Sequence, residues 1–210
     1  MRVRVLAGAV AAAAFIPTAV AAQACLGLPS SDGQIAVAGT GTLVNGDLEL
    51  GGEFHVDVTG PASFRVGYNN GHTETFSTPG GDVESRIGRG YSALASYELF
   101  LIDPSVCAVG GVSYTSDAGP GVEDQLGINL GFGLGKTLQA ESFSATIYAV
   151  PQYVRLQQKN VLDETVHSNE VMAEAGVTFG FFPFFVGGGV TLTTIGDGDP
   201  GLRVRAGILF

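Results

Sequence analysis

Apolar residues alternate with small or polar residues, one position at a time, through most of the chain after about residue 34. Consecutive side chains of a β-strand point to opposite faces, so this period of two predicts strands with one apolar face. Gly, Asn, Asp and Pro interrupt the alternation, as is typical of turns. Ten such segments occur, at about 34–44, 48–58, 62–69, 90–99, 106–114, 126–138, 143–152, 170–181, 184–195 and 202–210.

The composition supports this fold class. The 210 residues include 32 Gly and no Trp, and 45% are hydrophobic while only 14% are charged. The chain is too apolar for intrinsic disorder and too poor in Lys, Glu and Leu for a helical bundle. Beyond the N-terminal region, no run of about eighteen apolar residues predicts a membrane-spanning helix.

The N-terminus has the pattern of a secretory signal. Arg2 and Arg4 precede an apolar stretch at 5–16, and residues 22–24 (Ala-Gln-Ala) have the small-x-small form of a cleavage site. A permanent membrane helix is the alternative, but the stretch is short and polar chain follows it. We therefore predict a cleaved signal peptide at 1–24 and a single exported domain at 25–210.

The charge excludes one class of partner. Removing Arg2 and Arg4 from the ten basic residues leaves eight against twenty acidic residues, a formal charge of −12. A nucleic acid would need a basic patch that this sequence lacks, so we expect no nucleic-acid partner.

The connections between the ten segments are alternately short and long. The short ones lie at about 59–61, 102–104, 139–141 and 182–183, and the long ones at about 70–84, 116–124 and 157–168. A soluble β-sandwich also alternates, but strands of about ten residues with this order of connections match a transmembrane barrel. We predict an all-β, antiparallel, up-and-down transmembrane β-barrel of about ten strands, with eight as the alternative. An even strand number places both chain ends at the short, periplasmic turns.

Charged residues on the polar faces of these strands are predicted to line the lumen. A small barrel can hold such groups if each charge meets an opposite one, and its interior is largely filled by side chains. The network is interpreted as the gate of a narrow pore or as a fixed structural plug. Its members are Glu49, Glu53, His55, Asp57, Arg65, Glu98, Glu174, Arg203 and Arg205.

The two cysteines, Cys25 and Cys107, belong to a chain predicted to be exported, where disulfides form readily. One interpretation is a disulfide that tethers the N-terminus to the start of the fifth strand at the periplasmic rim. Two free thiols are the other. Lipid attachment at Cys25 is a third, although Ala-Gln-Ala departs from the usual Leu-x-Ala/Gly pattern.

The signal, the ten alternating segments and a last strand ending in Phe210 together resemble the small β-barrel proteins of Gram-negative outer membranes. The resemblance implies an integral outer-membrane location, contact with outer-membrane lipids and lipopolysaccharide, and a monomer. It also implies that the barrel assembly machinery recognises the last strand, through Val204, Ala206, Ile208 and Phe210.

Two arrangements of known barrel enzymes have partial counterparts in the chain. His55 and Asp57 share a face, as in the dyad of omptin proteases, but the matching Asp pair is missing. Residues 167–169 (His-Ser-Asn) lack the spacer of the His-x-Ser-Asn arrangement of lipid A deacylases. The sequence therefore predicts no enzyme, no catalytic residue, no cofactor and no metal site, with a lipid- or peptide-hydrolysing barrel as the weakest alternative.

Acidic pairs fall in the predicted outer loops. They solvate the loops or bridge divalent cations at the lipopolysaccharide surface. We predict a structural barrel or a narrow gated pore, and an adhesin that binds through its loops is the alternative. The pairs are Asp82/Glu84, Glu123/Asp124, Asp163/Glu164 and Asp197/Asp199.

The stretch 131–137 (GFGLGKT) looks like a phosphate-binding loop. That motif needs Gly at the position of Leu130, and the expected strand-loop-helix context is missing. We predict instead a strand whose leucines face lipid, whose glycines mark the widest part of the lumen, and whose Lys136 reaches the lipid headgroups.

Overall fold

The computed structural model describes residues 24–29, 35–44, 46–58, 61–70, 73–78, 81–86, 88–100, 103–119, 122–160, 164–193 and 200–210. Within these, the side chains of 73–78, 81–86, 117–119, 122–123 and 160 are left undescribed. The predicted signal peptide, apart from Ala24, lies outside the described residues. No helix in the described ranges is long and apolar enough to cross a membrane.

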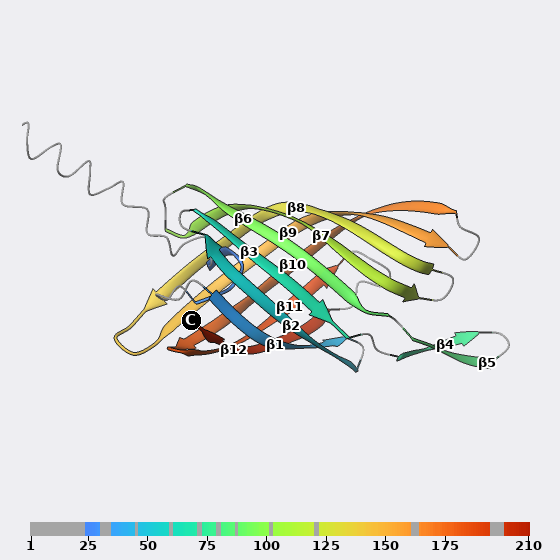
Figure 1. Ribbon diagram of the computed structural model, residues 1–210, viewed down its shortest axis with the longest axis horizontal. Coiled ribbons are helices and arrows are strands. Elements are labelled where there is room, and N and C mark those ends of the chain that lie inside the picture. The colour runs from blue at the N-terminus through green and yellow to red at the C-terminus, as the bar shows by residue number, and fades with distance from the viewer. Residues whose placement is uncertain are drawn as a thin grey trace, which may run out of the picture.

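Ten antiparallel strands close into a barrel, in the order β1-β12-β11-β10-β9-β8-β7-β6-β3-β2 (Figure 1). The first and last strands form the seam, from Ala36 opposite Leu209 to Leu43 opposite Leu202. The predicted fold class and the count of ten strands are confirmed. The strands are β1 (Ile35–Val44), β2 (Asp47–Val58), β3 (Ala62–Asn69), β6 (Gly90–Phe100), β7 (Ser105–Gly119), β8 (Val122–Gln139), β9 (Ser144–Asn160), β10 (Thr165–Phe181), β11 (Phe184–Thr193) and β12 (Gly201–Leu209).

Three predicted loops are wrong in part. The connection at 70–84 contains a two-stranded hairpin, β4 (Thr73–Thr78) and β5 (Gly81–Arg86), which extends beyond one end of the barrel (Figure 1). The connections at 116–124 and 157–168 are mostly strand, because β7 to β10 pair far beyond the predicted ends. A hairpin that leaves the membrane has water on both faces, so its backbone pairing continues while the apolar alternation stops.

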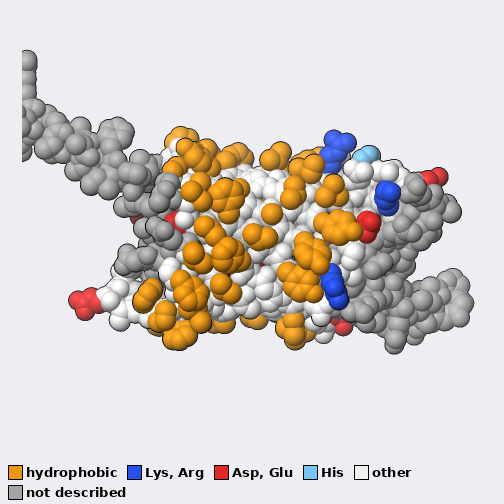
Figure 2. Space-filling view, viewed as in Figure 1, with side chains coloured by type: hydrophobic (Ala, Val, Ile, Leu, Met, Phe, Trp, Pro, Cys, Tyr) orange, Lys and Arg blue, Asp and Glu red, His pale blue; other side chains and the backbone are white. Residues whose placement is uncertain are grey.

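The outward face of the barrel is an apolar belt (Figure 2). On β8, Leu130 and Phe132 are 63% and 59% exposed, values that only a lipid environment makes favourable along a continuous band. Tyr68, Tyr91 and Tyr114 face one another across β3, β6 and β7, with the first two rings 5.4 Å apart. Such a row of amphipathic rings is typical of the membrane–water boundary.

The stretch 131–137 lies inside β8 and is a strand rather than a phosphate loop. Phe132 and Leu134 point outward, and Lys136 pairs with Asp103 at 3.0 Å beside a short turn. The glycines are predicted to mark the widest part of the lumen, and at Gly133 and Gly135 the room that they leave is occupied. A Cβ at either position would meet Cys25 or Ala24, so these glycines make room for the N-terminal segment.

Candidate lumenal site

Residues 24–29 enter the barrel at the end where both the C-terminus and the short turns lie; we call them the plug. All six residues are buried, and Leu26, Leu28 and Pro29 are among the largest fully buried side chains of the described chain. Leu26 packs with Leu94, Val109 and Val150 of the wall, and Leu28 packs with Phe185 and Leu209. By the rule that short turns are periplasmic, the plug fills the periplasmic half of the lumen.

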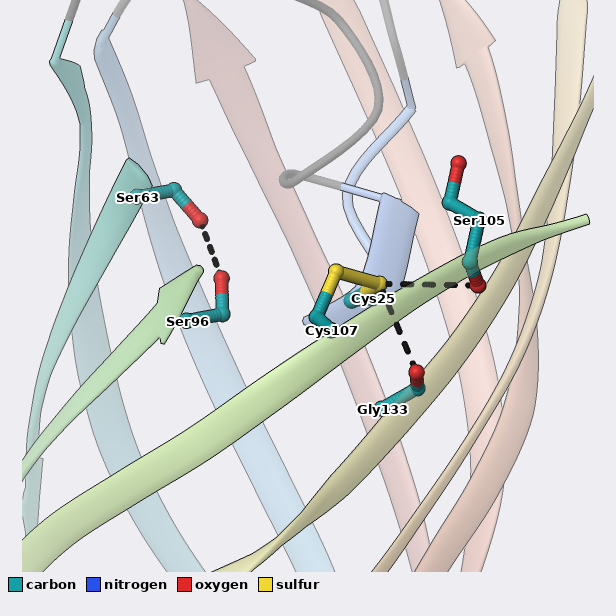
Figure 3. The surroundings of a disulfide bond; sticks show 6 residues. All are labelled: Cys25, Ser63, Ser96, Ser105, Cys107 and Gly133. Atoms are coloured by element: carbon teal, nitrogen blue, oxygen red, sulfur yellow. Dashed lines mark hydrogen bonds between the residues drawn. A yellow bond between two sulfur atoms is a disulfide. The ribbon is translucent and has the colours of Figure 1, made fainter. Parts of the chain in front are cut away.

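A disulfide joins the plug to the wall. Cys25 and Cys107 are bonded, with their Cα atoms 6.2 Å apart and both residues fully buried. Figure 3 shows the bond beside β8, where the Cys25 sulfur lies 3.6 Å from the carbonyl oxygen of Gly133. The pairing is one of the alternatives left open by the sequence, and it lies inside the barrel wall rather than on an exposed rim.

Polar contacts hold the plug from the opposite wall. Thr178 donates its hydroxyl to the Gly27 carbonyl at 2.7 Å, and Arg205 donates to the same carbonyl at 2.6 Å and to that of Leu26 at 3.3 Å. Gly27 has a φ of +76°, and a Cβ there would meet Arg205 and Tyr148. Glycine is therefore needed both for the backbone conformation and for the close approach.

Above the plug, charged side chains form one connected cluster, which we call the charge network. Glu174 accepts from Arg203 at 3.1 Å, from Arg65 at 3.4 Å and from the Tyr148 hydroxyl at 2.9 Å. Glu53 pairs with Arg203, with Arg65 at 3.9 Å and with Arg205 at 4.0 Å. Each carboxylate thus bridges at least two guanidinium groups, which is the arrangement that buried charges need.

The network and the plug are mechanically connected through Arg205. Its guanidinium carbon lies 4.9 Å from the centre of the Tyr148 ring, and the same side chain holds the plug carbonyls. Arg205 therefore contacts both the charge network and the plug. A substitution that moves one of them should also alter the hydrogen bonds of the other.

A cavity of about 220 Å³ lies at the end of the barrel opposite the plug; we call it the outer cup. Glu53 and Arg203 line its deepest part, so the charge network closes it from below. Gly67 and Gly90 also line it, and the room that they leave is taken by the side chains of Ser92 and Asn69. The polar side chains around it are those of Thr40, Thr42, Asn69, Ser92, Ser113 and Thr115.

The structure brings six of the nine predicted lumenal residues together, namely Glu53, His55, Arg65, Glu174, Arg203 and Arg205. His55 lies 3.2 Å from Glu53. Glu49 instead accepts from Asn69 at 3.3 Å near the outer end, while Asp57 and Glu98 lie nearer the short turns. The sequence did not single out Tyr148 and Thr178, although the alternation places both on the lumenal face. An uncharged residue on that face gives no sign of which residue it contacts.

The proposed assembly residues lie on the outward face of β12. Val204 and Phe210 are 60% and 66% exposed, and Ile208 also faces outward. The backbone of Phe210 exchanges hydrogen bonds with Ile35, which closes the seam at the chain's end. A role in recognition by assembly machinery stays a prediction.

The two enzyme-like arrangements do not assemble. His167 and Asn169 are exposed on the outer extension of β10, whereas Ser168 points to the other face and donates to Glu170 at 3.2 Å. His55 contacts Glu53. Among the described residues, no three His, Cys, Asp or Glu side chains are grouped to hold a metal ion.

Most of the acidic pairs predicted for the outer loops lie outside the described side chains. These are Asp82, Glu84, Glu123, Asp163, Asp197 and Asp199. Of the remaining two, Asp124 accepts a hydrogen bond from Tyr114 at 2.8 Å, and Glu164 is exposed. Binding through the loops therefore stays a prediction.

Known families and curated proteins give no match to this chain. Among solved structures, it is similar to LpxR from Salmonella typhimurium, with 13% identity and a TM-score of 0.42 over 78% of this chain and 72% of that one. The fold is that of a small outer-membrane β-barrel. The prediction of a non-enzymatic protein is corrected here, because LpxR is itself an enzyme. A likeness at this level gives this chain no activity of its own.

Proposed function

We propose that this outer-membrane barrel is closed to the periplasm by its plug and binds a small, neutral, polyhydroxylated solute in its outer cup. The observation that carries the proposal is the contrast inside one lumen. The periplasmic half is filled by buried side chains, whereas the outer half keeps a cavity of about 220 Å³ with hydroxyl groups on its walls.

The chemistry of the cup favours such a solute. Thr and Ser hydroxyls can each donate and accept, which matches the hydroxyl groups of a sugar. The two charged groups at the bottom, Glu53 and Arg203, are already paired with each other. The cavity is smaller than the roughly 300–1,000 Å³ of sites for drug-sized ligands, so the solute is about the size of one sugar ring.

Titration of the folded barrel with a neutral monosaccharide, followed by calorimetry, tests this function. The variant Thr115→Phe places a ring in the cup, and Val112→Phe places the same ring in the lipid belt on the same strand. We expect binding to the wild type and to Val112→Phe and its loss in Thr115→Phe. Absence of binding to the wild type, or equal binding to both variants, contradicts the proposal.

A gated pore is the second candidate, and one observation favours it. Apart from the main chain, which continues from the plug to β1, the plug and the wall share one covalent bond among the described residues, the disulfide, and the other ties are hydrogen bonds and packing. In planar bilayers, a gate of this kind gives no current when oxidised and a current once Cys25→Ser/Cys107→Ser frees the plug. If neither form conducts, the hypothesis of a gated pore is rejected.

A further inference from the structure

Strands β8, β9 and β10 lie side by side in the barrel (Figure 1), and their lumenal faces hold three buried oxygen atoms that no described donor reaches. These are Oδ1 of Asn129, Oε1 of Gln152 and Oε2 of Glu170, and the three residues are 5%, 3% and 8% exposed. A buried acceptor without a donor costs free energy, because it has lost its hydrogen bonds to water. In folded proteins such atoms are usually paired with a bound water or a ligand.

The strand register brings the three residues together. Asn129 of β8 and Glu170 of β10 both lie opposite Val154 of β9, and Gln152 is the next lumenal residue of β9 toward the short turns. Gln152 is therefore the diagonal neighbour of both, at a separation of roughly 7–8 Å. A gap of this size admits one small donor group between the side chains, with hydrogen bonds of about 2.9 Å.

The same wall carries a negative charge without a counter-ion. Glu53 and Glu174 each bridge guanidinium groups, whereas Glu170 accepts only from the Ser168 hydroxyl, at 3.2 Å, among the described residues. The other two oxygens belong to neutral amides. The set therefore matches a donor that carries one positive charge.

We propose that Asn129, Gln152 and Glu170, which we call the acceptor trio, bind the ammonium group of a small primary amine. A primary ammonium has three N–H donors and one positive charge, which equals the three unpaired oxygens and the one carboxylate. A calcium ion would need about six to eight oxygen ligands, which the trio does not provide. No hydrogen bond holds the two amide oxygens, so their side chains can rotate to admit the amine.

The outer cup gives access to the acceptor trio. A Cβ at Gly127 would meet the Ser113 hydroxyl and would lie 3.5 Å from Oδ1 of Asn129, so these two groups are close neighbours. Ser113 lines the cup, and Asn129 therefore lies directly behind the cup's wall. The trio is nevertheless a site of its own, because none of its three residues lines the cup.

The test is an NMR titration of the purified, folded barrel with methylammonium in neutral detergent. Tetramethylammonium is the matched ligand, since it has the same charge and no N–H donor. Glu170→Gln is the test variant, because it keeps the shape of the side chain and removes the charge. Glu49→Gln is the matched control, in which the same charge is removed from a carboxylate that pairs with Asn69. A heat-modifiable gel shift confirms that each variant is folded.

We expect the wild type and Glu49→Gln to bind methylammonium with a Kd on the order of 10 mM, close to the limit for two non-hydrogen atoms. Glu170→Gln should weaken this binding about tenfold, because a charge-assisted hydrogen bond is lost. Gln152→Met, which removes a neutral acceptor, should weaken it about threefold. Tetramethylammonium should not bind measurably to any of these proteins.

A stability measurement separates binding from a structural role. Without amine, Glu170→Gln should resist urea at least as well as the wild type, because the substitution removes a buried charge that has no counter-ion. A lower stability of this variant would mean that Glu170 supports the fold, and it would count against the proposal.

Four binding results overturn the proposal. The first is no binding of methylammonium to the wild type, and the second is wild-type affinity in Glu170→Gln. The third is equal binding of methylammonium and tetramethylammonium, which would show a general attraction of cations to the lumen. The fourth is displacement of methylammonium by an equal concentration of sodium chloride, which would make the trio a metal-ion site.

Discussion

The two halves of the lumen are filled by different means. The periplasmic half holds the chain's own residues 24–29, packed against Leu94, Val109, Val150 and Phe185 and fixed by a disulfide. The outer half keeps a polar cavity, and the charge network separates the two. A barrel of this size is normally filled by wall side chains alone. Here the glycines of β8 have no side chains to fill the lumen, and the plug occupies that space instead.

The largest effect should come from breaking the boundary between the halves. Glu174→Gln leaves Arg65 and Arg203 with only Glu53, so we expect a loss of about 3–5 kcal/mol in the free energy of unfolding. Glu49→Gln, which alters a pair near the outer end, should cost less than about 1 kcal/mol. Urea unfolding in lipid vesicles measures both, and similar losses would show that the network does not support the fold.

Removing the covalent tie of the periplasmic half should cost somewhat less. The disulfide spans 82 residues of sequence, and its loss in Cys25→Ser/Cys107→Ser should lower the unfolding free energy by about 3 kcal/mol. The wild type under reducing conditions is the matched comparison and should fall by the same amount. An unchanged stability in both would mean that packing alone holds the plug.

A smaller effect is expected where the plug approaches the wall most closely. Gly27→Ala adds a Cβ toward Arg205 and Tyr148 at a positive φ, which should cost about 2 kcal/mol. Gly39→Ala, with nothing within 4 Å of its added Cβ, should be neutral or slightly stabilising. Thermal midpoints of the two variants check this, and equal midpoints would show that the plug is loosely held.

The smallest effect concerns the link between the halves. Tyr148→Phe removes the hydroxyl that donates to Glu174 and should cost about 1 kcal/mol. Tyr153→Phe, on the lipid-facing side of the same strand, is the control and should cost less. If the two losses are reversed in size, Tyr148 is not part of the network.

The sequence was sufficient for the barrel and insufficient for its contents. Alternation along β8 and β10 has a single cause, lipid on one side and lumen on the other, so it could be read without a structure. A disulfide between Cys25 and Cys107 could be proposed from the sequence because the chain has two cysteines and so allows one pairing. The plug was not predictable, because residues 25–29 (Cys-Leu-Gly-Leu-Pro) are too few to show a period.

The hairpin extensions were missed for a related reason. Gln157 and Lys159 on one face and Gln158 on the other continue β9 with polar groups on both faces, so no alternation marks this part as strand. The alternation along β9 puts Tyr148 on the lumenal face, yet its contacts with Glu174 and Arg205 depend on strands far apart in sequence. The alternation tells which face a residue lies on. Its contacts across the lumen depend on the register of all the strands between.

Thiol accessibility tests the central claim most directly, since it compares the two halves in one protein. Thr115→Cys lies in the outer cup, and Thr178→Cys replaces a fully buried side chain that contacts the plug. With a membrane-impermeant maleimide added to both sides of a folded, unreduced barrel, we predict rapid labelling at 115 and none at 178, with both labelled after unfolding. Labelling of 178 in the folded barrel at a rate close to that of 115 would contradict a sealed periplasmic half.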